Sequence, residues 1–264
     1  MNIHEYQAKE ILHGFGAPIA EGIAITAIDQ AENAIAALPG PVWVIKSQIH
    51  AGGRGKGRFE ELRADAQGGV RVSFSKAEAL SNVGEMFGNT LVTNQTGPGG
   101  KQVNRLYIES GADIDRELYL SILVDRETGM TSFVASTQGG MDIEAVAEKT
   151  PDLIHTFSIK ASQGCTDADA ALVADSLQLI GTARAQGIAL FKSLYLAFTS
   201  KDMSLLEINP LVVTKSNEIL VLDAKVSFDE NALFRHPDLM AYRDETEEDA
   251  KEIEASKHGL AYIA

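Results

Sequence analysis

A polar amide and a carboxylate face each other in a hairpin predicted for residues 203–225. Val, Ile and Leu dominate both arms, and the tip at 215–218 is polar, as a turn requires. A turn centred on Ser216 places Asn209 of the first arm opposite Asp223 of the second. An amide and a carboxylate on one face form a hard-oxygen site of the kind that binds Mg2+, whose other ligands are waters and phosphate oxygens.

The same register predicts a second cross-strand pair. Side chains alternate between the two faces of a strand, so Glu207 shares the face of Asn209, and Lys225 shares that of Asp223. Glu207 then lies opposite Lys225. Polar pairs of this kind also occur on an ordinary solvated face, so the hairpin alone leaves both interpretations open.

A glycine-rich segment follows an apolar strand that carries Lys46 near its end. Residues 50–57 read His-Ala-Gly-Gly-Arg-Gly-Lys-Gly. Glycines let the backbone approach a ligand and direct N–H groups at it, while Arg54 and Lys56 add positive charge, so phosphate is the favoured ligand. The segment is neither a Walker A loop nor GxGxxG. A flexible, solvated hairpin loop is the alternative.

A third candidate site lies where the strand 103–108 ends and the chain turns. Glu109 follows the strand, and the small residues after it offer backbone hydrogen-bonding groups to a base. The Glu109 carboxylate suits ribose hydroxyls or an amino group. Alternation places Glu117 and Tyr119 on one face of the next strand. A charged hairpin rim is the alternative interpretation.

Composition restricts the possible partners. The chain has 264 residues, of which 45% are hydrophobic and 23% charged, enough for a substantial core. A net charge of -14 argues against nucleic acid or an anionic membrane, so an anionic ligand needs a local cationic cluster.

No apolar run approaches the ~20 residues that span a bilayer. The single cysteine, Cys165, and the absence of an export signal favour a cytoplasmic location. The six histidines show no metal or triad spacing.

The elements that position these residues mix strands and helices without strict alternation, which predicts an α+β fold with antiparallel sheets. The tail at 260–264 resembles the beginning of a further strand. Periodicity, capping residues and turn residues predict helices at 3–13, 29–38, 75–87, 142–148, 168–180, 183–199 and 244–259, and strands at 22–26, 42–47, 69–74, 91–93, 103–108, 117–124 and 131–136.

Taken together, these segments resemble the beta subunits of the succinyl-CoA synthetase (succinate–CoA ligase) family. The likeness runs in order along essentially the whole chain, and the combination of motifs is far more specific than any one of them. The matching segments are MNIHEYQAKEIL, WVIKSQIHAGGRGKG, QVNRLYIE with RELYL, STQGGMDIE, SLLEINPLVV, VLDAKVSFDENALFRHPDL and TEEDAKEIEASKHGLAYIA.

The resemblance implies an ATP-grasp fold, in which two α+β subdomains with mixed or antiparallel sheets hold the nucleotide between them. The expected domain spans 1–240, with a first subdomain at about 22–105 and a second built from 1–21 plus 106–240. Residues 241–264 are expected to form a linker helix. Because the family continues into a flavodoxin-like domain, this chain is expected to be a fragment that cannot complete the ligase reaction alone.

The resemblance also implies the reaction and its residues. Succinate, CoA and ATP are converted reversibly to succinyl-CoA, ADP and phosphate in the citric acid cycle, with the phosphate carried by a phosphohistidine of an alpha subunit. Glu207 would help to receive that phosphohistidine. The remaining implied ligands are Lys46 with the backbone of Gly53, Arg54 and Gly55 for phosphates, Glu109, Ala112 and Glu117 for adenine and ribose, and Asn209 and Asp223 for Mg2+.

Two alternatives remain open from the sequence. Beta subunits of malate–CoA ligases resemble the chain almost as well, and the residues that choose the acid lie largely outside it. A nucleotide-sensing or assembly module without chemistry is the alternative of another class, although such a module has no need for Glu207. ATP is favoured over GTP, but the base preference is not fixed by these residues.

Overall fold

Two separate hydrophobic cores organise the chain. The computed structural model describes residues 1–260 and 262. Each core lies between an antiparallel sheet and the helices that pack against it. The fold is therefore α+β with antiparallel pairing between neighbouring strands, as the sequence predicts.

The first sheet has four strands in the spatial order β1-β7-β2-β4. Side chains alternate between faces, so Ile45 and Ile108 are buried against two helices while Lys46 and Glu109 point to the opposite face. The elements are β1 (Gly22–Ile25), α2 (Ala31–Ala37), β2 (Trp43–Ser47), β4 (Val70–Ser73), α3 (Lys76–Met86) and β7 (Leu106–Ser110).

The second sheet has the order β10-β9-β8-β11-β12, and a further strand, β13, also pairs with β11. Two long helices pack on it, and Phe133 of the sheet contacts Phe191 of a helix edge to face, with ring centroids 6.3 Å apart. The elements are β8 (Ile114–Val124), β9 (Thr131–Ser136), α4 (Ile143–Lys149), β10 (His155–Ile159), α5 (Asp167–Ser176), α6 (Gly181–Ser200), β11 (Met203–Thr214), β12 (Ile219–Val221) and β13 (Ala224–Phe228).

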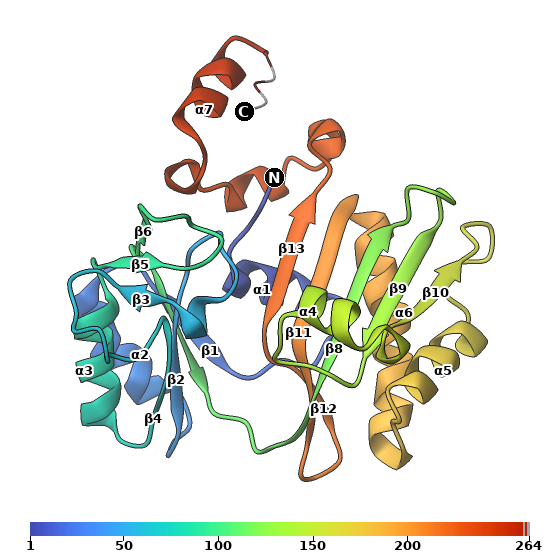
Figure 1. The fold of residues 1–264 in the computed structure, drawn as a ribbon, viewed down its shortest axis with the longest axis horizontal. Helices are drawn as coiled ribbons and strands as arrows, with labels where there is room; N and C mark the ends of the chain where they lie inside the picture. Colours follow the sequence, from blue (N-terminus) through green and yellow to red (C-terminus); the bar gives the residue numbers. More distant parts are fainter. Residues whose placement is uncertain (261, 263–264) are drawn as a thin grey trace.

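The N-terminal helix α1 (Glu5–Gly14) lies between the two sheets (Figure 1). Its apolar side, with Ala8, Ile11 and Leu12, is buried in the second core. The polar residues Glu5 and Lys9 are also buried, but they face the strands of the first sheet. The helix therefore connects the two halves of the molecule through chemically different faces.

A small third sheet and the glycine-rich loop lie beside the first sheet. The strands are β3 (Arg58–Phe59), β5 (Thr90–Val92) and β6 (Lys101–Gln102), in the order β3-β5-β6. Gly69, where the loop returns, approaches Leu91 so closely that a Cβ atom would lie 2.4 Å from its Cδ2. Only glycine allows this approach.

Polar side chains cap the beginnings of two helices. The Ser75 hydroxyl accepts a hydrogen bond from the Glu78 N–H at 3.2 Å, which caps α3. The Asp142 carboxylate accepts from the Glu144 N–H at 3.0 Å, so that it caps α4.

The C-terminal segment crosses back toward the first sheet as a series of 3₁₀ turns, Glu230–Arg235, Leu239–Tyr242 and Glu245–Glu247, followed by α7 (Ala250–Lys257). The strand expected at 260–264 falls mostly on positions 261 and 263–264, which lie outside the described residues. None of the helices within 1–260 has the length and apolar character needed to cross a bilayer.

Several expectations about the elements differ from the structure; the helix expected from residue 244, for example, begins at Ala250. β7 pairs with β1 and β2, so the expected subdomain boundary near residue 105 falls one strand too early. Strand β10 was not predicted, although its alternating residues pair with β9. Helix α5 ends at Ser176 rather than near 180, because Gln178 adopts a left-handed conformation.

Candidate functional site

The predicted hairpin register is confirmed. Glu207 of β11 lies opposite Lys225 of β13. Two residues further along, the N–H of Asn209 donates to the carbonyl oxygen of Asp223 at 3.1 Å. Asn209 of β11 therefore lies beside Asp223, which links β12 to β13, as a turn centred on Ser216 requires.

The Asn209 side chain holds the Gly-Gly turn that precedes α4. Its Oδ1 accepts from the Gly140 N–H at 2.7 Å, and its Nδ2 donates to the Met141 carbonyl at 2.9 Å. Gly140 has a φ of +68°, and a Cβ atom there would lie 2.2 Å from Glu117 Oε2. A glycine is thus required where Asn209 and Glu117 approach the turn.

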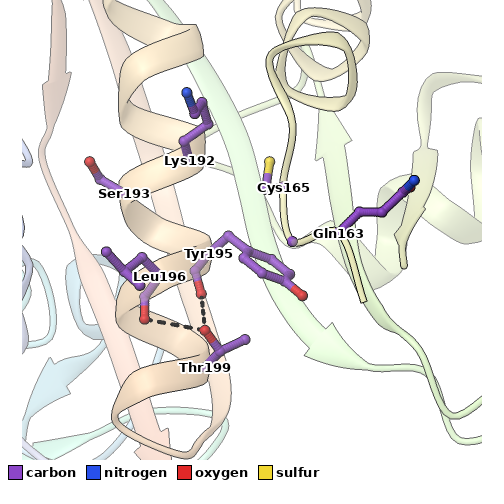
Figure 2. Close-up of a pocket in the computed structure, with 8 residues that line it drawn as sticks. Gln163, Cys165, Lys192, Ser193, Tyr195, Leu196 and Thr199 are labelled. Carbon is purple, nitrogen blue, oxygen red and sulfur yellow. Dashed lines mark hydrogen bonds between the residues drawn. The ribbon is translucent and has the colours of Figure 1, made fainter. Parts of the chain in front are cut away.

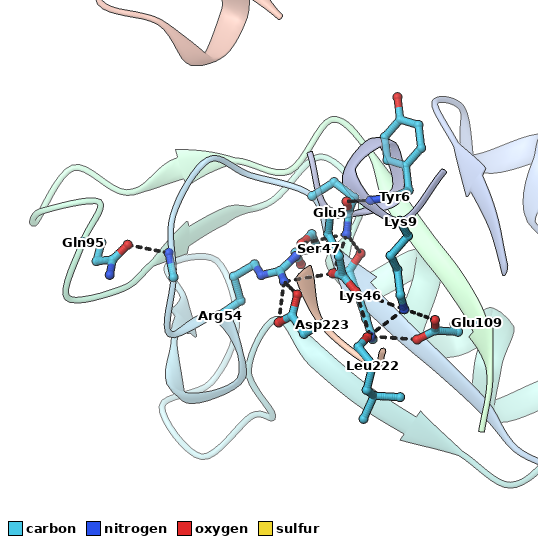
Figure 3. Close-up of polar contacts among 12 residues, drawn as sticks. Glu5, Tyr6, Lys9, Lys46, Ser47, Arg54, Gln95, Glu109, Leu222 and Asp223 are labelled. Atoms are coloured by element: carbon cyan, nitrogen blue, oxygen red, sulfur yellow. Dashed lines mark hydrogen bonds and ion pairs between the residues drawn. The ribbon is translucent and has the colours of Figure 1, made fainter. Parts of the chain in front are cut away.

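Lys46 is the centre of a buried network of charged side chains (Figure 3). Its ammonium nitrogen lies 2.8 Å from Glu5 Oε1, 2.7 Å from Glu109 Oε2 and 2.7 Å from the Leu222 carbonyl oxygen. Burial alone would lower the pKa of Lys46, but the negative charges of Glu5, Glu109 and Asp223 outweigh it and raise that pKa. Lys46 is therefore fully charged at neutral pH.

Arg54 brings the glycine-rich loop into the same network. Its guanidinium donates to the Ser47 carbonyl at 2.8 Å and lies 2.9 Å from Glu5 Oε2. The same nitrogen that reaches Glu5 donates to both Asp223 oxygens, each at 2.9 Å (Figure 3). Arg54 is buried, whereas Gly53 and Gly55 on either side of it are exposed.

Two members of the network, Glu5 and Lys9, were not among the predicted site residues. Lys9 is completely buried and donates to Glu109 and to the Leu222 carbonyl, the latter at 2.7 Å. The available signal was a Glu–Lys pair four residues apart on an amphipathic helix. That spacing is common on solvated faces, so it does not reveal burial.

The network balances its charges. Burial would raise the pKa of Glu5, but Lys46, Arg54 and Lys9 hold it well below its usual range, so Glu5 is ionised. Burial and the charge of Lys46 lower the pKa of Lys9, against the opposing effect of Glu109. Three carboxylates compensate three cations: Glu5, Glu109 and Asp223 against Lys9, Lys46 and Arg54.

Glu109 is expected to bind ribose hydroxyls or an amino group, but it does not face solvent. Its side chain is completely buried, and its carboxylate is held by Lys9 and Lys46. Two desolvated ammonium groups require a buried counter-charge, which explains why the strand presents Glu109 inward. Glu109 therefore contacts the two lysines rather than solvent.

The other two residues expected near the base lie in the second half of the molecule. Ala112 is half-buried in the short connection between β7 and β8, and Glu117 is exposed on β8. Glu117 accepts a backbone hydrogen bond from Gly139 at 3.2 Å. Both residues lie outside the Lys46 network.

Glu207 is a half-buried carboxylate with an environment of mixed charge. Burial raises its pKa, the Lys225 ammonium lowers it, and the nearby Asp223 and Glu144 carboxylates raise it further. The net effect is a raised pKa. Glu207 is therefore more readily protonated than an ordinary glutamate.

Asn209 and Asp223 fit a hard divalent cation. They supply an amide oxygen and a carboxylate, and the Asp223 side chain is 35% exposed. Across residues 1–260 and 262, no cluster of three or more His, Cys, Asp or Glu side chains forms a protein-only metal cage. An amide oxygen with one carboxylate is a donor set of the kind that Mg2+ uses, with water and phosphate as its remaining ligands.

A cavity of about 350 Å³ lies on α6, away from these residues, and is lined by Cys165, Lys192 and Tyr195 (Figure 2). Burial and the charge of Asp169 raise the pKa of the Cys165 thiol to about 11. Cys165 is therefore a protonated thiol at neutral pH and supplies no nucleophile to this cavity.

Known protein families and sequences resemble this chain along most of its length. A family model described as an ATP-grasp domain matches residues 2–213. The chain is 66% identical over all 264 residues to the succinate–CoA ligase (ADP-forming) subunit beta of Brucella anthropi, and 65% identical to that of Brucella ovis. It spans 66% of the length of each of these relatives.

Solved structures support the fold. ATP citrate lyase from Methanothrix soehngenii, in complex with citrate and coenzyme A, superposes with a TM-score of 0.65 at 16% identity, covering 97% of this chain and 59% of that one. The dinucleotide-forming acetyl-coenzyme A synthetase 1 of Ca. Korarchaeum cryptofilum, in complex with coenzyme A and Ca-AMPCP, gives a TM-score of 0.61 at 16% identity, covering 86% and 93%.

Proposed function

This chain belongs to the ATP-grasp family, and from that premise we propose that it is the nucleotide-binding part of a succinate–CoA ligase beta subunit. The identity of 66% to the Brucella anthropi protein along the entire chain supports this assignment. The proposed reaction is the reversible, cytoplasmic conversion of succinate, CoA and ATP to succinyl-CoA, ADP and phosphate. An alpha subunit is the proposed partner, because these relatives are named as beta subunits.

The observation that carries the proposal is the convergence of Lys46, Arg54 and Asp223 at the junction of the two sheets. Lys46 comes from a strand of the first sheet, Arg54 from the glycine-rich loop and Asp223 from the link between β12 and β13. Phosphoryl transfer needs mainly positioning and charge neutralisation. Lys46, Arg54 and the exposed backbone of Gly53 and Gly55 supply both for the nucleotide phosphates.

Asn209 and Asp223 hold Mg2+ in this proposal. When bound, the ion neutralises phosphate charge that Lys46 and Arg54 do not reach. Both Asp223 oxygens now accept hydrogen bonds from Arg54. Nucleotide binding must therefore transfer Arg54 from Asp223 to a phosphate, which makes the carboxylate available.

Glu207 orients the phosphate carrier. Its half-buried carboxylate lies two residues from Asn209 on the same strand, and its raised pKa favours a shared proton. We assign it the role of receiving the imidazole of a phosphohistidine from the alpha subunit. The backbone of Ala112 and the exposed Glu117 contact adenine and ribose, whereas Glu109 positions Lys46 from behind.

Calorimetric titration of the chain with Mg-ADP tests the nucleotide site. We expect saturable binding that weakens by at least about tenfold in Lys46→Ala and Asp223→Ala, since each variant removes a charged hydrogen-bonding group from the phosphate or metal site. Asp113→Ala, which breaks only an exposed ion pair with Lys215, should bind as the wild type does. Absence of Mg-ADP binding by the folded wild-type chain would refute the assignment.

The catalytic part of the proposal requires the longer subunit and its partner. The full beta subunit, mixed with a phosphohistidine-bearing alpha subunit, should transfer phosphate to ADP. Glu207→Gln should slow that transfer while leaving Mg-ADP affinity unchanged, because Glu207 acts on the imidazole. Equal loss of nucleotide binding and transfer in Glu207→Gln would contradict its role.

A further inference from the structure

We propose that Glu5 is a positioning residue that fixes the separation of Lys46 and Arg54 before nucleotide binds. The proposal rests on the assigned nucleotide site and adds to it a residue outside the strands and loop that form that site. Each oxygen of the Glu5 carboxylate contacts a different cation: Oε1 lies 2.8 Å from the Lys46 ammonium, and Oε2 lies 2.9 Å from the Arg54 guanidinium.

Glu5 is itself held firmly. It is the first residue of α1, and its side chain is only 2% exposed. The Gln48 side-chain Nε2 donates to Glu5 Oε2 at 3.3 Å, and its side-chain Oε1 accepts from the Tyr6 N–H at 3.3 Å. The apolar side of α1 anchors the helix in the second core. The carboxylate therefore does not follow the glycine-rich loop when the loop moves.

The two carboxylates on Arg54 have different roles because their exposure differs. Asp223 has a side chain that is 35% exposed, so water, metal or phosphate can replace its contact with Arg54. Glu5 is buried beneath the guanidinium and lies 3.7 Å from a third cation, Lys9. A phosphate arriving from solvent displaces Asp223 first, and Arg54 remains attached to Glu5.

Without Glu5, the Lys46 ammonium and the Arg54 guanidinium would remain buried near one another with one fewer negative charge to neutralise them. Charged groups in a desolvated site require a partner, and removal of one partner leaves the others uncompensated. Lys46 would keep Glu109, and Arg54 would keep Asp223, but no group would join the two. Phosphate binding would then have to order both side chains, and the free energy of this ordering would weaken the affinity.

The test compares Mg-ADP and AMP binding by calorimetry in wild type, Glu5→Gln and Glu5→Asp. Glutamine has nearly the same shape, but its amide presents donors to a cation. We expect Glu5→Gln to weaken Mg-ADP binding about 10- to 100-fold, the range for lost charged hydrogen bonds, with a smaller effect on AMP. Aspartate keeps the charge but is too short to reach both cations, so its affinity should be intermediate.

Glu10→Gln is the matched control, because Glu10 lies on the same helix and is exposed. It should bind both nucleotides as the wild type does. A folding defect would weaken ADP and AMP binding alike, and circular dichroism melts of each variant would reveal it. If Glu5→Gln does not fold, Glu5→Asp provides the comparison through its ADP-to-AMP affinity ratio.

The outcomes separate the two proposals. A wild-type chain that fails to bind Mg-ADP refutes the nucleotide site itself. A wild-type chain that binds, with Glu5 variants that bind ADP equally or more tightly, refutes the positioning role and leaves the site intact. Tighter binding would identify Glu5 as an anion that merely competes with phosphate.

Discussion

One nitrogen of the Arg54 guanidinium donates to both carboxylate oxygens of Asp223, each at 2.9 Å. This contact joins the glycine-rich loop beside the first sheet to the β12–β13 link of the second sheet. It pairs a proposed phosphate ligand with a proposed metal ligand. The two opposite charges neutralise each other, and the contact holds the loop against the second sheet.

Asp223→Asn should therefore loosen the loop. We expect trypsin to cleave faster after Lys56 or Arg58, both exposed, because each ~1.4 kcal/mol of lost local stability raises the open population about tenfold. Cleavage rates followed by mass spectrometry measure this, and Asp113→Asn controls for loss of a surface carboxylate. Equal rates in wild type and Asp223→Asn would show that other contacts hold the loop.

Lys9→Met should destabilise the fold by about 3–5 kcal/mol, the usual cost of removing one partner from a buried ion pair. Lys9 is completely buried, and its loss leaves Glu109 with Lys46 alone. Urea unfolding at pH 7 measures the change. Lys215→Met, at an exposed ion pair, should change stability by less than about 0.5 kcal/mol. A change below about 1 kcal/mol in Lys9→Met would contradict the need for its charge.

The hairpin around Ser216 shows what local sequence determines. Alternating apolar residues and a polar tip specify both strands and their register, so the sequence alone places Asn209 opposite Asp223. Strand β10 has the same kind of alternation, with Phe157 and Ile159 two residues apart. The polar residues at its other positions and the helix before it make this alternation hard to recognise in the sequence.

The charged network shows what local sequence does not determine. Glu5 and Lys46 are 41 residues apart, and Lys9 and Leu222 are 213 residues apart. Each charge alone fits a solvated surface. The packing of α1 between the two sheets buries these charged side chains. Each buried charge then requires an oppositely charged partner. For the same reason Glu109, expected as a ligand for ribose or an amino group, lies in the interior.

Asp244→Asn should release the C-terminal segment from the first half of the molecule. One Asp244 oxygen contacts His4 Nε2 at 2.8 Å and also accepts from Arg105; the other accepts from the Thr246 hydroxyl at 2.6 Å. We expect a loss of about 1–3 kcal/mol and faster amide exchange across 244–257. Asp238→Asn, which breaks an exposed pair with Lys201, is the control. Unchanged exchange would show that the segment is held elsewhere.

Acid should weaken the fold through His4, which is buried between the N-terminal helix and this segment. Burial and the positive charges of Arg105 and Arg54 lower the pKa of His4 to about 3, despite its contact with Asp244. The neutral ring is therefore the folded form. Because the unfolded chain binds a proton near pH 6.5, the stability contribution is complete above that pH and decreases as the pH falls toward 3.

The expected loss from His4 alone is about 2 kcal/mol between pH 7.5 and pH 5. The neighbouring His50, whose pKa burial and His4 lower to about 3, adds a loss of the same sign. Urea unfolding across this range should give a flatter pH profile for His4→Gln than for the wild type, since glutamine does not titrate. His258→Gln, at an exposed position, should keep the wild-type slope. Identical slopes for His4→Gln and the wild type would mean that His4 takes up its proton at the same pH in the folded and the unfolded chain, so that burial does not lower its pKa.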